Sequence, residues 1–206
     1  KFFLAIVIVS MIANEYSYGT LKQNLIDGMS KKEFILSKFL TILALSFFST
    51  VFIFVLSLVL GYSFSSYNEL GIVFSDLDYL LAYFVNLVGF FSLCLFLAVL
   101  IKRSAFALGF LFIWFLVEKI SYSYFKFEVF NRSSKVDDVY SFFPLESIGN
   151  LIVEPFTRFS VIRSLQTTIG DNTIKDYSIH FSSLVIVCAW VSIFIYASYK
   201  IIQRRD

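Results

Sequence analysis

Few side chains in this sequence could catalyse a reaction or hold a metal ion. It has one histidine, His180, and two cysteines, Cys94 and Cys188, each cysteine inside a long apolar run. Neither cysteine has further ligand residues at a spacing that zinc uses, so no metal site is predicted, and a disulfide scaffold is not expected. Glu118 and Lys119 are neighbours near the end of an apolar run, and we interpret them either as an interfacial ion pair or as side chains that snorkel to its polar boundary. Neither enzyme activity nor a bound cofactor is expected.

The chain also lacks the phosphate-binding loop of ATPases. The pattern Gly-x4-Gly-Lys-Ser/Thr, whose backbone N–H groups cradle nucleotide phosphates, occurs nowhere in the 206 residues. The apolar runs contain almost none of the acids and histidines that proton- or ion-coupled transporters use. If the protein performs work, we therefore expect a partner chain to supply the energy.

Composition indicates an integral membrane protein. Of its residues 58% are hydrophobic, 20% aromatic and 16% charged, and the mean hydropathy is +0.80. Soluble domains average about 45–50% apolar and about 25% charged residues. The hydrophobicity excludes a disordered chain. A formal net charge of only +2, without a dense basic face, argues against nucleic acid as a partner. The lipid bilayer is the expected surrounding.

Continuous apolar runs predict membrane-spanning helices. A helix needs about 20 apolar residues to cross the hydrocarbon core, and uninterrupted runs favour helices over a membrane β-barrel. Four runs reach or approach this length, and a fifth is a partial span at the start of the chain: 39–61, 79–101, 104–121, 180–202 and 1–14. We predict an all-α integral membrane protein with five spans in a single transmembrane domain, 1–206. Because the chain starts inside an apolar run, a sixth span upstream is expected.

Lysine and arginine predict the orientation, because cytoplasmic loops carry an excess of both. The segment 15–38, the turn 102–104 and the C-terminal tail are basic, whereas 62–78 contains no lysine or arginine. We therefore expect the three basic segments, and the C-terminus, on the cytoplasmic side of the plasma membrane. The segment 122–178 is then external.

The external segment 122–178 has helical patterns of its own. Pro144 followed by Glu146 predicts the start of a short interfacial helix. A second is predicted from the helical spacing of Ile162, Leu165 and Ile169.

The cytoplasmic segment 15–38 reads as two helices rather than a flexible loop. Thr20 followed by Gln23, and Ser30 followed by Glu33, match the capping box, in which two side chains satisfy the N–H groups at a helix start. Two helix starts are therefore predicted within one connection.

The first of these helices is predicted over 21–27 and is closed by Gly28, at the position where a left-handed cap favours glycine. The second runs from 31 to 60, about 45 Å at 1.5 Å per residue, so its first turns project beyond the bilayer. Two interpretations remain open for the short helix. It lies on the membrane surface, or it docks a cytoplasmic partner, since a plain connection needs only about two to eight residues.

The same segment resembles the cytoplasmic loop of type-2 ABC transporter permeases. The resemblance is carried by an acidic residue, a Gly-Thr-Leu triplet, a Ser-Lys pair and a lysine that opens the next span. The tight basic turn and the long external segment before the last span are also similar. In that family the short helix is a coupling helix that seats in a cleft of an ATP-binding subunit. The family's short external helices are implied to dip into the membrane and close the pathway.

The resemblance implies a docking role for the residues that match the motif: Glu15, Gly19, Thr20, Leu21, Lys22, Ser30, Lys31 and Lys38. We add Leu25 for apolar contact with the partner and Lys32 for charge complementarity at its rim. Gly28 is included because of its capping position.

Small polar residues inside the spans form a further group. Ser46, Thr50 and Ser57 share one face of the 39–61 span, with Ser49 beside them, and Asn86 lies in the next span. Small and hydroxylated residues let membrane helices approach closely, so packing is the first interpretation. Lining a substrate pathway is the second.

These features predict the permease subunit of an ABC exporter. It is expected to act as a homodimer or with a similar permease, because five or six helices cannot easily enclose a route for a large substrate. The alternative is a membrane anchor that binds a cytoplasmic protein without moving substrate. An intramembrane enzyme ranks third, because the sequence lacks a catalytic constellation.

Overall fold

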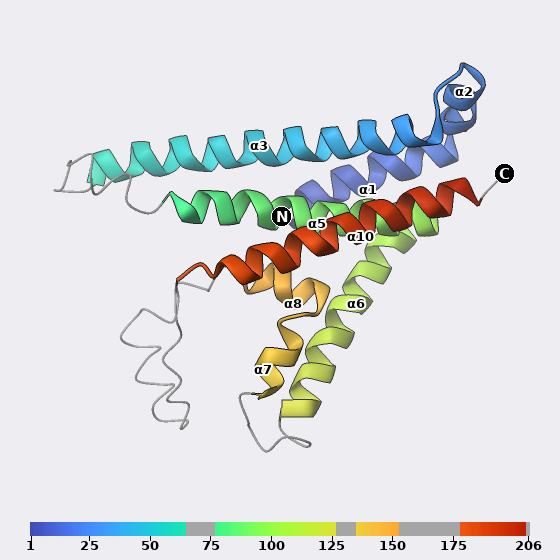
Figure 1. Cartoon of the computed structure of the whole chain (residues 1–206). Coiled ribbons are helices and arrows are strands. Elements are labelled where there is room, and N and C mark those ends of the chain that lie inside the picture. The colour runs from blue at the N-terminus through green and yellow to red at the C-terminus, as the bar shows by residue number, and fades with distance from the viewer. Residues whose placement is uncertain (65–76, 127–134, 153–177, 205–206) are drawn as a thin grey trace.

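The computed structural model describes residues 1–64, 77–126, 135–152 and 178–204, and all regular structure in them is helical (Figure 1). The helices, in chain order, are α1 (Phe2–Ser17), α2 (Thr20–Ile26), α3 (Lys31–Phe64), α5 (Asp78–Ile101), α6 (Ser104–Tyr124), α7 (Lys135–Tyr140), α8 (Pro144–Gly149) and α10 (Phe181–Gln203). The predicted all-α class is confirmed.

Four of these helices, α3, α5, α6 and α10, are long and apolar enough to cross a membrane. The 16-residue α1 is shorter, but it passes the same test together with α2, from which it is separated by a bend of 67°. The described residues thus contain four candidate spans, or five if the bent pair is counted as one. The helix expected to start at residue 31 does so, and runs for 34 residues.

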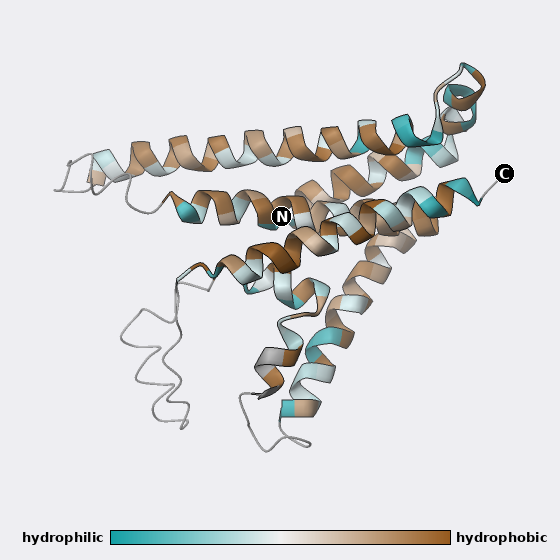
Figure 2. Ribbon diagram, in the orientation of Figure 1, coloured by the Kyte–Doolittle hydropathy of each residue, from teal (hydrophilic) through white to brown (hydrophobic). Residues whose placement is uncertain are grey.

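Helix α5 is the centre of the bundle. It packs against α1, α3, α6 and α10, and the short α8 also touches it. In its most apolar stretch 72% of the residues are buried, against 17% or less in the other three spans. The outward faces of α3 and α6 are largely hydrophobic (Figure 2). Such faces suit lipid, because hydrocarbon tails are as apolar as the side chains they meet.

The three basic segments meet at one end of the bundle, where α3 starts, α5 turns into α6 and α10 ends (Figure 1). Lys31 Nζ lies 3.5 Å from the carbonyl oxygen of Gln203, and Lys32 Nζ lies 5.9 Å from the centre of the Tyr199 ring. We call this the basic end and the other the outer end. The hydrophilic residues concentrated at the start of α3 and the end of α10 mark it in Figure 2.

At the outer end a short helix, α8, begins at Pro144, as the sequence predicts, with Glu146 in its first turn. The second helix expected there, around Ile162, Leu165 and Ile169, lies outside the described residues.

Glycine at position 89 lets α8 and α10 approach α5. A Cβ atom placed there would stand 2.8 Å from Cγ1 of Val187 and 3.2 Å from Cγ1 of Ile148. Both distances are shorter than ordinary van der Waals contact, and branched side chains cannot swing away freely. Gly89 therefore sets how closely three helices meet.

We expect Gly89→Leu to lower the stability of the folded chain by about 1–3 kcal/mol, because overpacking a close-packed contact forces its neighbours to shift. Thermal unfolding of the purified protein in detergent measures the change. Gly109→Leu is the matched control, since a Cβ at Gly109 meets nothing within 4 Å. Equal effects of the two substitutions would contradict the role assigned to Gly89.

Candidate functional site

The basic end is built around the sharp turn between α1 and α2. Gly19, with φ +73°, occupies the left-handed region and is the N-cap of α2. The capping box predicted for Thr20 and Gln23 is therefore wrong: Thr20 is already helical, and no side chain caps α2. The Thr20 hydroxyl instead donates to the carbonyl oxygen of Glu15, at 3.4 Å, because the tight turn brings the end of α1 within its reach.

The far end of α2 is closed by a Schellman motif. Gly28 has φ +104°, its N–H donates to the Leu25 carbonyl at 3.3 Å, and the N–H of Met29 donates to the Asn24 carbonyl at 3.0 Å. The left-handed cap predicted at Gly28 is confirmed. Both ends of α2 are thus defined by glycines in a conformation that other residues adopt only with strain.

The second capping box is confirmed in both directions. The Ser30 N–H donates to Glu33 Oε2 at 2.7 Å, and the Glu33 N–H donates to Ser30 Oγ at 3.2 Å. The short link between the Schellman motif and this box leaves little slack between α2 and α3.

An ion pair joins the ends of α1 and α3. Lys38 Nζ donates to Glu15 Oε1, and both side chains are more than four-fifths buried. The Lys38 ammonium also lies 5.3 Å from the centre of the Phe34 ring. Removing one partner would leave a largely buried charge without compensation, which is why such a pair holds its two helices in register. The sequence pattern had singled out both residues, which are 23 positions apart.

The apolar residues of α2 divide between two faces. Leu21 is buried, at 8% exposure, and Leu25 is half-buried against the hydrophobic core. Ile26 is 84% exposed. Of the three apolar residues, it is therefore Ile26 that a partner can reach, together with the exposed polar residues Lys22, Gln23 and Asp27. The apolar pattern alone could not assign these faces, because all three apolar residues occur within seven positions and nothing in their spacing shows which of them contacts the bundle.

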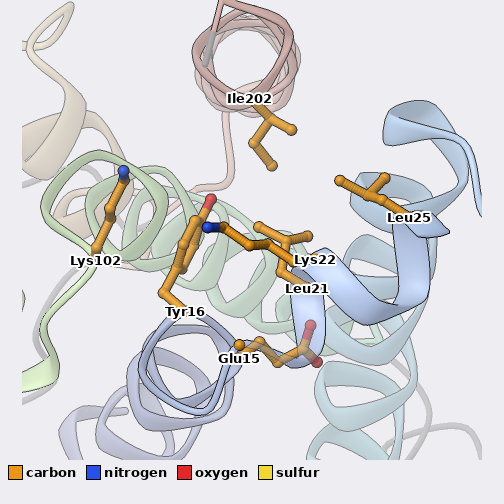
Figure 3. Close-up of a pocket in the computed structure, with 8 residues that line it drawn as sticks. Glu15, Tyr16, Leu21, Lys22, Leu25, Lys102 and Ile202 are labelled. Atoms are coloured by element: carbon orange, nitrogen blue, oxygen red, sulfur yellow. The ribbon is translucent and has the colours of Figure 1, made fainter. Parts of the chain in front are cut away.

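A cavity of about 160 Å³ opens between α2 and the ends of α1, α5 and α10 (Figure 3). Its wall contains two lysines, a carboxylate, a tyrosine and apolar side chains: Glu15, Tyr16, Gly19, Leu21, Lys22, Leu25, Lys102 and Ile202. Five of these residues belong to the predicted docking set. Lys102 and Ile202 are lining residues that sequence reasoning missed, because they come from distant segments and match no motif.

Comparison with known proteins agrees with this arrangement. The family described as "ABC-2 family transporter protein" matches residues 2–206, nearly the whole chain. The chain belongs to this family. No curated protein and no solved structure matches it. Membership makes the chain a membrane permease of the ABC transporter class, and it agrees with the resemblance carried by the loop between α1 and α3.

Within this ABC-2 permease the hydroxyl groups predicted as a pathway or packing face do not line the cavity. Ser49 and Thr50 donate to carbonyls one turn back in α3, at 2.7 and 2.8 Å. Ser46 is fully buried, whereas Ser57 is exposed. Local bonds to the helix backbone are what a hydroxyl adopts in an apolar surrounding. Asn86 does reach another element, since its amide donates to the Ile148 carbonyl in α8.

The outer end of the permease holds a second polar network, centred on Glu118. Its side chain is 5% exposed and accepts a hydrogen bond from Trp114 Nε1 at 2.6 Å. It also faces the backbone N–H groups of Leu145 and Glu146, at 3.5 and 3.2 Å. No side chain within α8 caps that helix, so a carboxylate from α6 caps it instead.

The predicted ion pair between Glu118 and Lys119 is not formed. Neighbouring residues on a helix point about 100° apart, so Glu118 turns into the protein while Lys119 Nζ pairs with Glu146 Oε2 at 2.7 Å. Asn150 Nδ2 donates to the other oxygen of Glu146, at 3.0 Å. Among the described residues no group of three or more His, Cys, Asp and Glu side chains could hold a metal ion.

We expect Glu118→Ala to destabilise the protein by about 3 kcal/mol, because it leaves the Trp114 indole N–H and the first amides of α8 without an acceptor. Lys119→Gln is the comparison, since its half-exposed ion pair is worth at most about 1 kcal/mol. Thermal unfolding in detergent measures both. A loss for Lys119→Gln that matches or exceeds that for Glu118→Ala would refute the assignment of Glu118 as the cap of α8.

Proposed function

We propose that this chain is the membrane-spanning subunit of an ABC exporter whose ATP is hydrolysed by a separate ATP-binding subunit. The basic end is then the cytoplasmic side, with the C-terminus inside, in agreement with the clustering of lysine and arginine there. The observation that carries the proposal is α2, which lies at the outside corner between the end of α1 and the start of α3 (Figure 1) and exposes Ile26. A large exposed aliphatic side chain on a tightly capped helix suits insertion into a partner's cleft.

The mechanism that we infer is mechanical. The ATP-binding subunit grips the exposed face of α2 and moves when it binds ATP. Leu21 anchors α2 in the hydrophobic core, and the Glu15–Lys38 ion pair ties α1 to α3. Displacement of α2 therefore tilts both helices together rather than bending the connection. Continuous over 34 residues, α3 carries that tilt to the outer end.

A second permease completes the pathway in this proposal, either another copy of the chain or a similar one. The support is the outward face of α3, where large apolar side chains are exposed, among them Phe47, Phe48 and Phe52. At the outer end α8 closes the route between two permeases until α6 and α10 move apart. Its bonds to α5 and α6, through Asn86 and Glu118, are what such opening would break.

Substitution of Ile26 by aspartate tests the docking face. We expect Ile26→Asp to weaken binding of the ATP-binding subunit by about 2 kcal/mol, roughly 30-fold in Kd, because it places a charge where an apolar anchor is needed. Co-purification of the ATPase with the full-length protein from its native host, in mild detergent, measures the loss. Since Ile26 is exposed, the variant keeps its fold.

Two controls accompany this variant. Gln23→Asp adds the same negative charge to the exposed face of α2 without removing the apolar anchor, so we expect it to lose less of the ATPase than Ile26→Asp does. Leu25→Asp loses the ATPase for a different reason, because it unseats α2, and its unfolding temperature falls as well. Undiminished recovery of the ATPase with Ile26→Asp would overturn the docking proposal. Recovery of an ATPase whose turnover no substrate alters would favour the membrane anchor.

A further inference from the structure

The cavity at the basic end has room and charge for an anionic ligand. Its volume of about 160 Å³ is many times the ≈10–15 Å³ that a single water needs. Lys22 extends toward Tyr16 from one side, and Lys102 stands on the other (Figure 3). Apolar walls at Leu25 and Ile202 complete the lining. A ligand with a polar group of several atoms attached to an apolar part would match this lining of charged and apolar side chains.

The conformation of Lys102 points to a role beyond folding. It is the only non-glycine residue with a positive φ in the described part of the chain, at +63°, where it follows the last turn of α5. Glycine is the residue that this left-handed position favours. Lysine is held there with its ammonium 5.7 Å from the centre of the Tyr16 ring. Residues with such a strained backbone conformation are enriched at binding sites, where the function of the side chain can offset the cost in stability.

Positive charge dominates the cavity. The single carboxylate in its wall, Glu15, has one oxygen bound by Lys38, while its Oε2 is buried without a hydrogen-bond partner. Neither Lys22 nor Lys102 has an acidic partner within ion-pair distance among the described residues. Together with Lys38, the two ammonium groups beside Tyr16 outnumber the single carboxylate of Glu15, so the net charge around the cavity is positive and favours an anion.

The position of the cavity indicates which class of anion it binds. It lies at the ends of α1, α5 and α10, where the apolar residues of these helices give way to polar residues, lysines and arginines among them, as at the headgroup level of a membrane. Lysine and tyrosine at such a depth extend toward the interface. We propose that the cavity binds the phosphate of an anionic phospholipid headgroup and so fastens α2 to the bundle. The assignment to the cytoplasmic leaflet rests on the proposed function.

Phosphatidylglycerol is the probe, with phosphatidylcholine as the lipid of equal size and no net charge. We expect added phosphatidylglycerol to raise the unfolding temperature of the purified full-length protein in neutral detergent more than phosphatidylcholine does. Native mass spectrometry should show phosphatidylglycerol retained on the protein. Lys22→Gln should weaken the lipid's apparent affinity about tenfold.

Lys102→Gly separates ligand binding from folding. Glycine relieves the left-handed strain, so without added lipid this variant should unfold at the same temperature as the original protein or higher. Its apparent affinity for phosphatidylglycerol should nevertheless fall about tenfold. Lys32→Gln is the matched control, because it removes one lysine from the same end of the bundle but outside the cavity. It should keep the lipid response, whereas general attraction to a charged surface would fall equally in all three variants.

Three results would overturn the inference. The first is an equal response to the two lipids, and the second is an equal loss in Lys32→Gln and Lys102→Gly. The third is stabilisation by inorganic phosphate that phosphatidylglycerol does not displace, which would make a free phosphate the ligand. Failure here is distinct from failure of the proposed function. Lipid selectivity without a co-purifying ATPase would reject the exporter alone, and Ile26-dependent ATPase binding without lipid selectivity would reject the lipid site alone.

Discussion

Burial of α5 on all sides is the constraint on which the rest of this permease depends. Lipid provides no hydrophobic force between membrane helices, so they associate through close packing and polar contacts. The central helix meets four long neighbours and α8, with Gly89 at the close approach of α8 and α10 and with small, fully buried residues also at Ala82 and Ala98. The other long helices each pack one face against α5, so their remaining apolar faces can stay exposed.

Packing against one apolar helix does not by itself fix how far its neighbours slide along it. Polar contacts at the two ends do this. At the basic end the Glu15–Lys38 ion pair sets α1 against α3, and at the outer end Glu118 and Asn86 hold α8 on α6 and α5. In a low-dielectric surrounding these contacts are costly to break, so each defines one arrangement.

The short helix α2 connects these constraints to the outside of the protein. Its inner face belongs to the bundle through Leu21, its outer face carries Ile26, and Lys22 faces a cavity shared with the end of α5. A partner ATPase and a lipid headgroup would therefore act on one seven-residue element from different sides. Because only two residues separate α2 from α1 and four separate it from α3, whatever holds α2 would also position those two helices.

The sequence by itself determined the features that depend on neighbours along the chain: the helical class, the long spans, the Ser30–Glu33 box and the cap at Gly28. Hydropathy, helix period and capping all depend on residues that are close together along the chain, so they can be predicted from the sequence alone. Only the tertiary structure decided that Glu118 caps α8 rather than pairing with Lys119, that Ile26 and not Leu25 faces outward, and that Lys102 joins Lys22 at one cavity. Those outcomes depend on which distant segments meet, and similar apolar helices offer many pairings until packing and buried polar bonds select one.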